Sequence, residues 1–257
     1  MTADLRLGRW QDVLQGVEVD ALICDPPYSA RTHEGTEQDM LDRTTSPKKH
    51  KEKKAGPRAP TGWTRADGYT EKPHNPSSTR KALNYASWTH DDVRTFCNHW
   101  APRTRGWFVA FTSHDLCPVY AEALEAAGRY VFSPLPWFSP GSRVRLSGDG
   151  PSSWTCWMMV SRPRHAPYSK WGTLPGGYMT PPEACEVVGG KPLGLMQAIV
   201  RDYSRPGDLV CDPFVGSGTT ALAALSEGRR FVGSEQKPEH YEIARRRLDR
   251  GYTPTMF

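Results

Sequence analysis

Short apolar runs alternate along this chain with segments in which apolar residues recur every three or four positions. The first pattern is typical of buried β-strands and the second of amphipathic helices. Strands are predicted over residues 19–24, 106–111, 130–138, 154–160, 209–211 and 230–233. Helices are predicted over residues 91–100, 116–127, 191–203, 219–227 and 238–250. This alternation predicts an α/β fold with a mostly parallel sheet and helices on both faces.

The predicted helices carry end signals of their own. Gly128 and Gly228 follow two of the periodic segments, at the position where glycine commonly ends a helix. Pro238 stands where proline fits the first helical turn. These signals support the helix assignments without deciding what the fold does.

Residues 29–86 lose all apolar periodicity and are rich in Lys, Pro, Thr, Ser and Gly. A loop of this length is usually functional or disordered. Because 257 residues fit one large domain, we interpret 29–86 as an insertion in a single domain over 1–257.

The basic character of the chain is concentrated inside this insertion. The net charge is +5, and residues 43–58 hold seven Lys or Arg and one Glu. The other 26 of 33 basic residues and 27 of 28 acidic residues lie outside that run, so the rest of the chain is nearly neutral. Such a run usually engages phosphates or stays solvated.

Several protein classes are disfavoured by the same sequence. Met1 to Arg9 lacks the apolar stretch of a signal peptide, and no apolar run approaches the ~20 residues that span a membrane. No Cys-x-x-Cys pair occurs, so we predict no metal site. Cys24 and Cys211 end predicted strands and are interpreted as small core residues. A cytoplasmic protein without disulfides or membrane association is expected.

A glycine loop, Asp212-Pro213-Phe214-Val215-Gly216-Ser217-Gly218, lies between a predicted strand and a predicted helix. Glycines let a backbone approach a ligand closely, and ligands of open α/β sheets bind outside the carboxyl ends of the strands. The loop lacks the lysine of phosphate-binding loops. Glu235 ends the next strand, where a carboxylate can accept hydrogen bonds from ribose hydroxyls. A nucleoside ligand without phosphates fits this set; a plain strand-to-helix turn and a solvated Glu235 are the alternatives.

The tetrapeptide Asp25-Pro26-Pro27-Tyr28 follows another apolar strand. An exocyclic amine on adenine or cytosine is a poor nucleophile because its lone pair is delocalised into the ring. The Asp25 carboxylate and the Pro26 carbonyl can accept its N–H groups, while Tyr28 offers a face for stacking an extruded base. Two prolines stiffen the loop. The alternative is a proline turn with an unrelated tyrosine beside it.

Together, the two motifs and their order resemble the permuted (beta-group) amino-methyltransferases of DNA. In that group the Asp-Pro-Pro-Tyr motif comes first and the cofactor loop comes last. The stretch from Gly190 to Thr220 is similar to the joined cofactor motifs of the group. The resemblance covers residues 5–28 and 187–250 and is looser between them.

The resemblance implies a Rossmann-like S-adenosylmethionine-dependent methyltransferase fold with a seven-stranded, mostly parallel sheet. Strand 208–212 would lie beside 230–235, with residues 5–7 beyond it. Strands 19–25, 106–112, 154–161 and 129–138 would follow on the other side.

The resemblance also implies the site residues. Catalytic residues would be Asp25, Pro26, Pro27 and Tyr28. S-Adenosylmethionine would be bound by Asp212, Pro213, Phe214, Gly216, Ser217, Gly218, Thr219, Thr220, Glu235, Lys191, Pro192 and Leu193. Within this set Glu235 would hold the ribose, and Lys191, Pro192 and Leu193 match the helix start that closes the pocket.

Two departures from the family pattern matter. Family members often carry Gly-Asp where this chain has Gly8-Arg9, and Arg9 cannot accept from the cofactor's adenine amine. Trp10 is a candidate to stack on that ring instead, with a core or surface role as the alternative. A separate recognition domain is also missing, so target reading would fall to 29–86 or be weakly selective.

The insertion is therefore a candidate DNA-recognition segment. Its predicted DNA-binding residues are Lys48, Lys49, Lys51, Lys53, Lys54 and Arg58. Aromatic residues beyond them suit base stacking: Trp63, Tyr69, Tyr85 and Trp88. The alternative is a solvated, mobile loop. Both descriptions hold if the segment becomes ordered only when it binds DNA.

The expected function is a site-specific DNA methyltransferase acting on adenine N6 of a flipped base. An Asp at the first motif position favours adenine, as the resemblance implies, and cytosine N4 is the alternative target. Cytosine-C5 chemistry needs a cysteine nucleophile after proline, whereas this chain has only the reverse order, Cys117-Pro118. A catalytically silent DNA-binding module on the same fold stays open, as do a homodimer, a restriction endonuclease partner and a place in a restriction-modification system.

We predict that replacing the five lysines between 48 and 54 by Gln weakens DNA binding and flattens its dependence on salt. Each lost phosphate contact removes released counterions, so the slope of log K against log salt falls. Fluorescence anisotropy across a salt series measures this, and unchanged affinity rules the role out.

Overall fold

The computed structural model describes residues 3–31, 86–140, 153–165, 171–181, 185, 187 and 189–251. Most of the predicted insertion, including its six predicted DNA-binding residues and Trp63, Tyr69 and Tyr85, lies outside these ranges.

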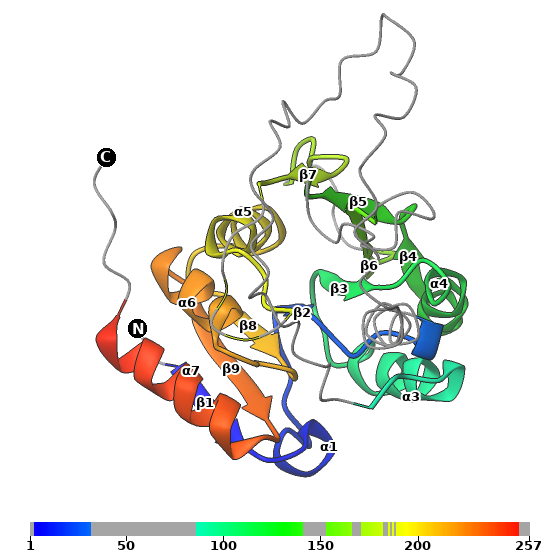
Figure 1. Ribbon diagram of the computed structural model, residues 1–257. Helices are drawn as coiled ribbons and strands as arrows, with labels where there is room; N and C mark the ends of the chain where they lie inside the picture. The colour runs from blue at the N-terminus through cyan, green and yellow to red at the C-terminus, as the bar shows by residue number, and fades with distance from the viewer. Residues whose placement is uncertain are drawn as a thin grey trace, which may run out of the picture.

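Within the described ranges, nine strands form one sheet (Figure 1). They are β1 (Ala3–Leu7), β2 (Ala21–Cys24), β3 (Phe108–Thr112), β4 (Arg129–Val131), β5 (Leu135–Phe138), β6 (Thr155–Pro163), β7 (Tyr178–Met179), β8 (Leu209–Asp212) and β9 (Arg230–Glu235). Their order is β1-β9-β8-β2-β3-β6-β5-β7, and β4 also pairs with β6. The first five strands of this order are parallel, whereas β6 runs antiparallel to β3, β4 and β5. The α/β class and the predicted order of the strands are confirmed.

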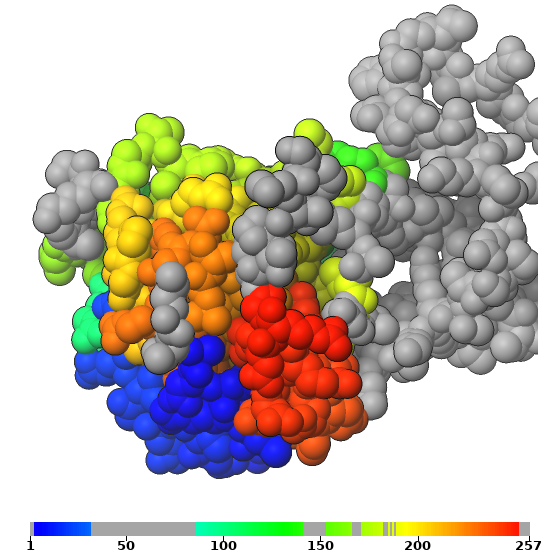
Figure 2. All heavy atoms as spheres, turned by 90° about the vertical axis from the view of Figure 1, so that its left-hand side faces the viewer, coloured from blue at the N-terminus to red at the C-terminus, as the bar shows by residue number. Residues whose placement is uncertain are grey.

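Helices cover both faces of the sheet (Figure 1). They are α1 (Trp10–Val13), α3 (His90–Trp100), α4 (Cys117–Ala126), α5 (Leu193–Tyr203), α6 (Thr219–Ser226) and α7 (Pro238–Arg250). The first three lie on one face and α5, α6 and α7 on the other. In Figure 2, α7 (red) lies against the N-terminal segment (blue) that contains β1, beside α6 (orange).

Each face has its own apolar core. On one face Phe96, Trp100 and Tyr120 are fully buried against the sheet, and on the other Ile199 and Val200 are. Every residue of β2 is buried, because the strand lies mid-sheet with helices on both sides. That position explains why its sequence is a continuous apolar run.

The prediction of seven strands was wrong, and two local features explain the difference. The expected strand over 130–138 is divided into β4 and β5, because Pro134 has no N–H with which to continue a ladder. Beyond β6 the chain also contains the two-residue strand β7, which was not among the predicted strands and which pairs with β5. Gly177 makes that approach possible, since a Cβ there would lie 2.8 Å from the carbonyl oxygen of Pro136.

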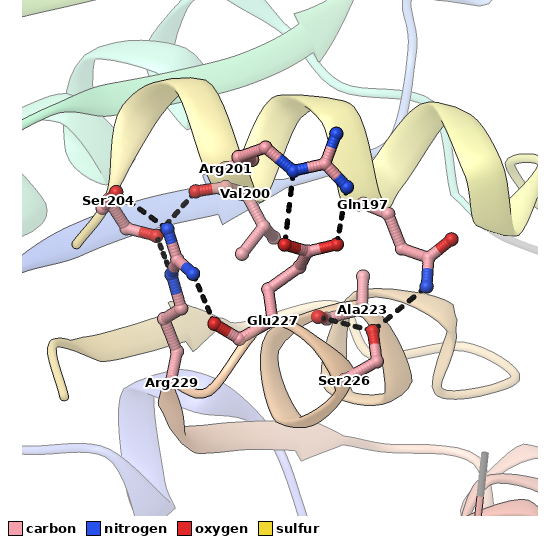
Figure 3. Close-up of polar contacts among 8 residues, drawn as sticks. All are labelled: Gln197, Val200, Arg201, Ser204, Ala223, Ser226, Glu227 and Arg229. Atoms are coloured by element: carbon pink, nitrogen blue, oxygen red, sulfur yellow. Dashed lines mark hydrogen bonds and ion pairs between the residues drawn. The ribbon is translucent and has the colours of Figure 1, made fainter. Parts of the chain in front are cut away.

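Polar contacts anchor α5 on α6 (Figure 3). Arg201 forms a two-pronged ion pair with Glu227, at 2.6 and 3.1 Å, and Gln197 donates to Ser226 at 2.9 Å. Arg229 donates to both the hydroxyl and the carbonyl oxygen of Ser204, at 2.9 Å each. The helix that follows Lys191 and Pro192 is thus held against the helix that follows the glycine loop.

We predict that Gly233→Ala destabilises the fold by roughly 1–3 kcal/mol, the usual cost of overpacking a core. A Cβ at this position of β9 would lie 2.5 Å from both the Asp212 carbonyl oxygen and Val215 Cγ2, so backbone must move. Gly194→Ala is the matched control, since nothing lies within 4 Å of its Cβ position in α5. Urea unfolding measures both; equal stabilities of the two variants would contradict the prediction.

Candidate active site

The two motifs meet because β2 and β8 are neighbours. These strands pair in parallel, with Ala21 opposite Val210 and Leu22 opposite Cys211. Their carboxyl ends therefore leave the sheet at the same edge, which brings Asp25 and Asp212 into one neighbourhood although 187 positions separate them. This is the edge at which open α/β sheets bind ligands.

The Asp25 carboxylate is held on both oxygens. The Tyr28 hydroxyl donates to Oδ1 at 3.0 Å, and the Lys191 ammonium donates to Oδ2. The Tyr28 hydroxyl also lies 2.8 Å from Cys156 Sγ in β6. The Asp25 side chain remains 28% exposed while Lys191 is 6% exposed, so the carboxylate is the more accessible of the pair.

The residues around this pair are largely aromatic. The Lys191 ammonium lies 4.9, 5.5 and 5.9 Å from the ring centroids of Phe111, Tyr28 and Trp137, within cation–π range. Tyr28 is 5% exposed and Phe111 is fully buried. The partly exposed carboxylate of Asp25 is thus the polar group that this largely buried aromatic cluster presents.

The glycine loop closes on the Asp212 side chain. Asp212 accepts from the Phe214 amide at 2.9 Å and from the Thr220 hydroxyl at 2.6 Å. Gly216 and Gly218 have positive φ values of 56° and 85°, which glycine adopts without strain. The sequence places glycine where the turn into α6 needs it.

A side chain of α7 holds the glycine loop in place. Arg247 donates to the carbonyl oxygen of Ser217 at 2.6 Å, to its hydroxyl at 2.9 Å and to the Thr219 hydroxyl at 3.2 Å. A Cβ at Gly218 would lie 3.1 Å from Ala244 Cβ, so α7 packs directly on the loop. Sequence reasoning missed Arg247, because nothing local marks which arginine of an arginine-rich helix faces inward.

Glu235 lies beside the same loop. Its two carboxylate oxygens accept from the backbone amides of Gly216 and Lys237, each at 2.8 Å. The end of β9 and the glycine loop are therefore joined through this side chain, as a shared ligand pocket requires.

Phe214 connects the loop to the other motif. Its ring packs on Trp88 and Phe96, with centroids 5.4 and 5.6 Å away, and the Trp88 amide donates to the Tyr28 carbonyl at 2.9 Å. Trp88, which the sequence suggested as a base-stacking residue, thus packs between the two motifs.

Trp10 occupies a different place from the one the resemblance suggested. It is 6% exposed and lies in the core, with its ring 5.7 Å from Phe96 and 6.1 Å from Trp100. These contacts support the core role that the sequence left open rather than stacking on a cofactor.

Pro192 is buried directly before α5, and Leu193 is that helix's first residue, two positions later than predicted. Pro213 is buried in the loop, and Pro26 and Pro27 follow Asp25 at the edge of the sheet. The predicted catalytic and cofactor-binding residues other than Trp10 therefore gather at the carboxyl ends of β2, β8 and β9 or at the starts of α5 and α6.

Burial dominates the electrostatics of Asp212. It raises the pKa of this carboxyl to about 7, against the hydrogen bonds from Thr220 and Phe214, and the nearby charges of Asp25 and Glu235 act in the same direction as burial. Burial also raises the pKa of the Cys24, Cys97 and Cys211 thiols, which for Cys24 and Cys211 fits their interpretation as core residues. Cys156 is buried as well, and the sequence did not signal its contact with Tyr28.

Two classes of site are not found among the described residues. They contain no cluster of three or more His, Cys, Asp or Glu side chains that could hold a metal ion. In the same ranges, none of the helices has the length and apolar character of a membrane span.

Comparison with known proteins points to one family. A family model described as DNA methylase matches residues 156–246. The type II methyltransferase M2.DpnII of Streptococcus pneumoniae is 46% identical over 59 residues, 23% of this chain and 22% of that protein. The DNA adenine methyltransferase YhdJ of Escherichia coli (strain K12) is also 46% identical over 59 residues, covering 23% and 20%. The matched part of the chain thus spans about a fifth of the length of these relatives.

Solved structures match over nearly the whole chain. The crystal structure of the M1.HpyAVI–SAM complex has a TM-score of 0.62 at 20% identity, covering 96% of this chain and 100% of that one. The PvuII DNA methyltransferase, named as cytosine-N4-specific, has a TM-score of 0.58 at 14% identity, covering 100% and 89%. The fold predicted from the sequence is confirmed, and the family match supports an amino-methyltransferase.

We predict that Asp212 makes the fold less stable as pH rises. A folded-state pKa of about 7 exceeds the usual value near 4, so the native state binds more protons between those pH values. The free energy of unfolding should therefore fall across that window, by up to about 4 kcal/mol from this group. Asp212→Asn should flatten the fall in urea unfolding at pH 4.5, 6 and 7.5, whereas Asp91→Asn, on an exposed side chain, should not. Parallel curves for wild type and Asp212→Asn would contradict the burial argument.

Proposed function

We propose that this protein is a DNA methyltransferase that transfers the methyl group of S-adenosylmethionine to the N6 amine of adenine. The observation that carries the proposal is the position of the Asp25 carboxylate. It follows β2, directly beside the strand whose end begins the glycine loop. A hydrogen-bond acceptor for an amine and the glycine loop thus share one edge of the sheet.

The pocket residues fit S-adenosylmethionine chemically. Gly216 and Gly218 open the backbone, Glu235 offers carboxylate oxygens for ribose hydroxyls, and the carboxylates favour a ligand that carries positive charge. No lysine in the loop provides for phosphates. When bound, the cofactor would supply a methyl group on a sulfonium, whose C–S bond breaks as the N–C bond forms.

Asp25 and Pro26 would act on the amine. An N–H donated to the carboxylate and another to the Pro26 carbonyl draw the nitrogen toward tetrahedral geometry, which frees its lone pair for attack. Tyr28 would stack on the extruded base. The nitrogen releases one proton on methylation, and the exposed part of Asp25 connects it to solvent.

Adenine is favoured by the aspartate that opens the tetrapeptide and by the similarity to YhdJ, a DNA adenine methyltransferase. The cytosine-N4 alternative is supported by the fold shared with the PvuII enzyme. Mass spectrometry of nucleosides from DNA methylated by this protein separates N6-methyladenine from N4-methylcytosine directly.

The role of residues 29–86 in DNA recognition belongs to the same proposal. It rests on the lysine run between residues 48 and 54. The single domain, the homodimer, the restriction endonuclease partner and the cytoplasmic location stay predictions.

We predict that Asp25→Ala lowers methyl transfer to DNA by at least about 100-fold, because the amine loses its principal acceptor. Cofactor affinity should change by less than about threefold, since Asp25 faces the amine in this proposal. Radiolabelled methyl transfer and calorimetric titration of the cofactor measure the two effects. Glu235→Gln is the matched comparison, and we expect it to lose mainly affinity for the cofactor.

Two outcomes would count against the proposal. Equal losses of rate and cofactor affinity in Asp25→Ala would put this residue in the cofactor pocket. A wild type that binds duplex and single-stranded DNA well but labels neither would favour the silent DNA-binding module.

A further inference from the structure

Lys191 is buried to an extent that is unusual for lysine. Its side chain is 6% exposed, and buried lysines generally need a partner for their charge. The partner is Asp25 Oδ2, and the carbonyl oxygen of Gly189 accepts a second bond at 3.3 Å. The ammonium of Lys191 is therefore directed at the carboxylate that the proposed function makes central.

Aromatic rings fix the ammonium on its other sides. Phe111, Tyr28 and Trp137 place their rings 4.9 to 5.9 Å from it and come from three different segments of the chain. Among the described residues, its polar contacts are with Asp25 and Gly189 and not with the glycine loop. The resemblance assigned Lys191 to the cofactor, whereas these contacts assign it to Asp25.

The backbone that carries Lys191 is also anchored. Pro192 follows it and is buried, and α5 begins at the next residue. The ion pair and hydrogen bonds of Figure 3 hold α5 on α6. A group supported in this way has the preorganisation that orienting a reactive side chain requires.

The second oxygen of Asp25 is held more loosely. It accepts from the Tyr28 hydroxyl at 3.0 Å, and that hydroxyl has another partner, Cys156 Sγ, at 2.8 Å. Tyr28 can therefore release Oδ1 and keep a polar contact, whereas the contact on Oδ2 is buried with Lys191.

We propose, on the premise of the methyl transfer proposed above, that Lys191 is a positioning residue for Asp25. Its ammonium holds Oδ2 throughout the reaction. Oδ1, released by Tyr28, then accepts the N–H of the target amine. Cys156 makes the release of Oδ1 possible, because the Tyr28 hydroxyl turns from the carboxylate to the thiol when the base enters.

The test is Lys191→Met, which keeps most of the length of the side chain and removes its charge. We expect kcat to fall about 10- to 100-fold, the range for losing a hydrogen bond to a charged group. The KM for DNA and the Kd for S-adenosylmethionine should stay within about threefold, because Lys191 touches neither in this scheme. Single-turnover methyl transfer and calorimetric titration provide the two readouts.

Chemical rescue sharpens the test. Lys191→Ala leaves a space bordered by a carboxylate and three rings, which suits a small alkylammonium ion. Methylammonium chloride should raise the methyl-transfer rate of Lys191→Ala at least tenfold. Sodium chloride at equal ionic strength should not. This rescue also tests whether the ammonium positions Asp25 if Lys191→Met folds poorly.

Arg245→Met is the control for losing a cation away from the site. It removes an exposed ion pair with Glu242 in α7, on a side chain that is 56% exposed, and its kcat should stay within twofold of wild type. Unchanged kcat in Lys191→Met, cofactor affinity lost in proportion to rate, or no rescue of Lys191→Ala would each overturn the inference while leaving an active wild type. A wild type that methylates no DNA would instead remove the proposed function itself.

Discussion

The parallel pairing of β2 with β8 is the constraint on which the site depends. Two buried strands, far apart in sequence, lie side by side in the middle of the sheet, and their ends define where Asp25 and the glycine loop emerge. Because a one-residue slip would turn every side chain to the other face, two-sided burial fixes this register strongly. Apolar residues that contact no ligand thereby set the geometry of the polar ones.

The site also holds buried carboxylates, and their burial lowers the stability of the fold. Asp212 is buried near Asp25 and Glu235, so three carboxylates share one edge of the sheet. Lys191 and the backbone amides that bond to Glu235 and Asp212 offset part of this charge. Burial that disfavours the ionised form of Asp212 before a ligand binds is well matched to a ligand carrying positive charge.

Much of this architecture was predictable, for identifiable reasons. The apolar runs and the glycine or proline signals located the main strands and helices, because burial and backbone conformation leave marks in local sequence. The division at Pro134, the short strand β7 and the inward turn of Arg247 were not predictable, since each depends on a partner distant in the chain. Trp10 shows the same limit: its indole suits stacking equally well on a ligand or on Phe96. The Lys191–Asp25 pair likewise joins residues 166 positions apart.

The contact of Arg247 with Ser217 and Thr219 has a consequence for how the molecule is made. The ribosome delivers the tetrapeptide and the loop before it delivers α7, yet α7 supplies the guanidinium that pins the loop and the surface on which Gly218 rests. A nascent chain that ends before position 247 would hold both motifs and still lack a braced donor pocket. A glycine loop braced by Arg247 can therefore form only after α7 has been synthesised.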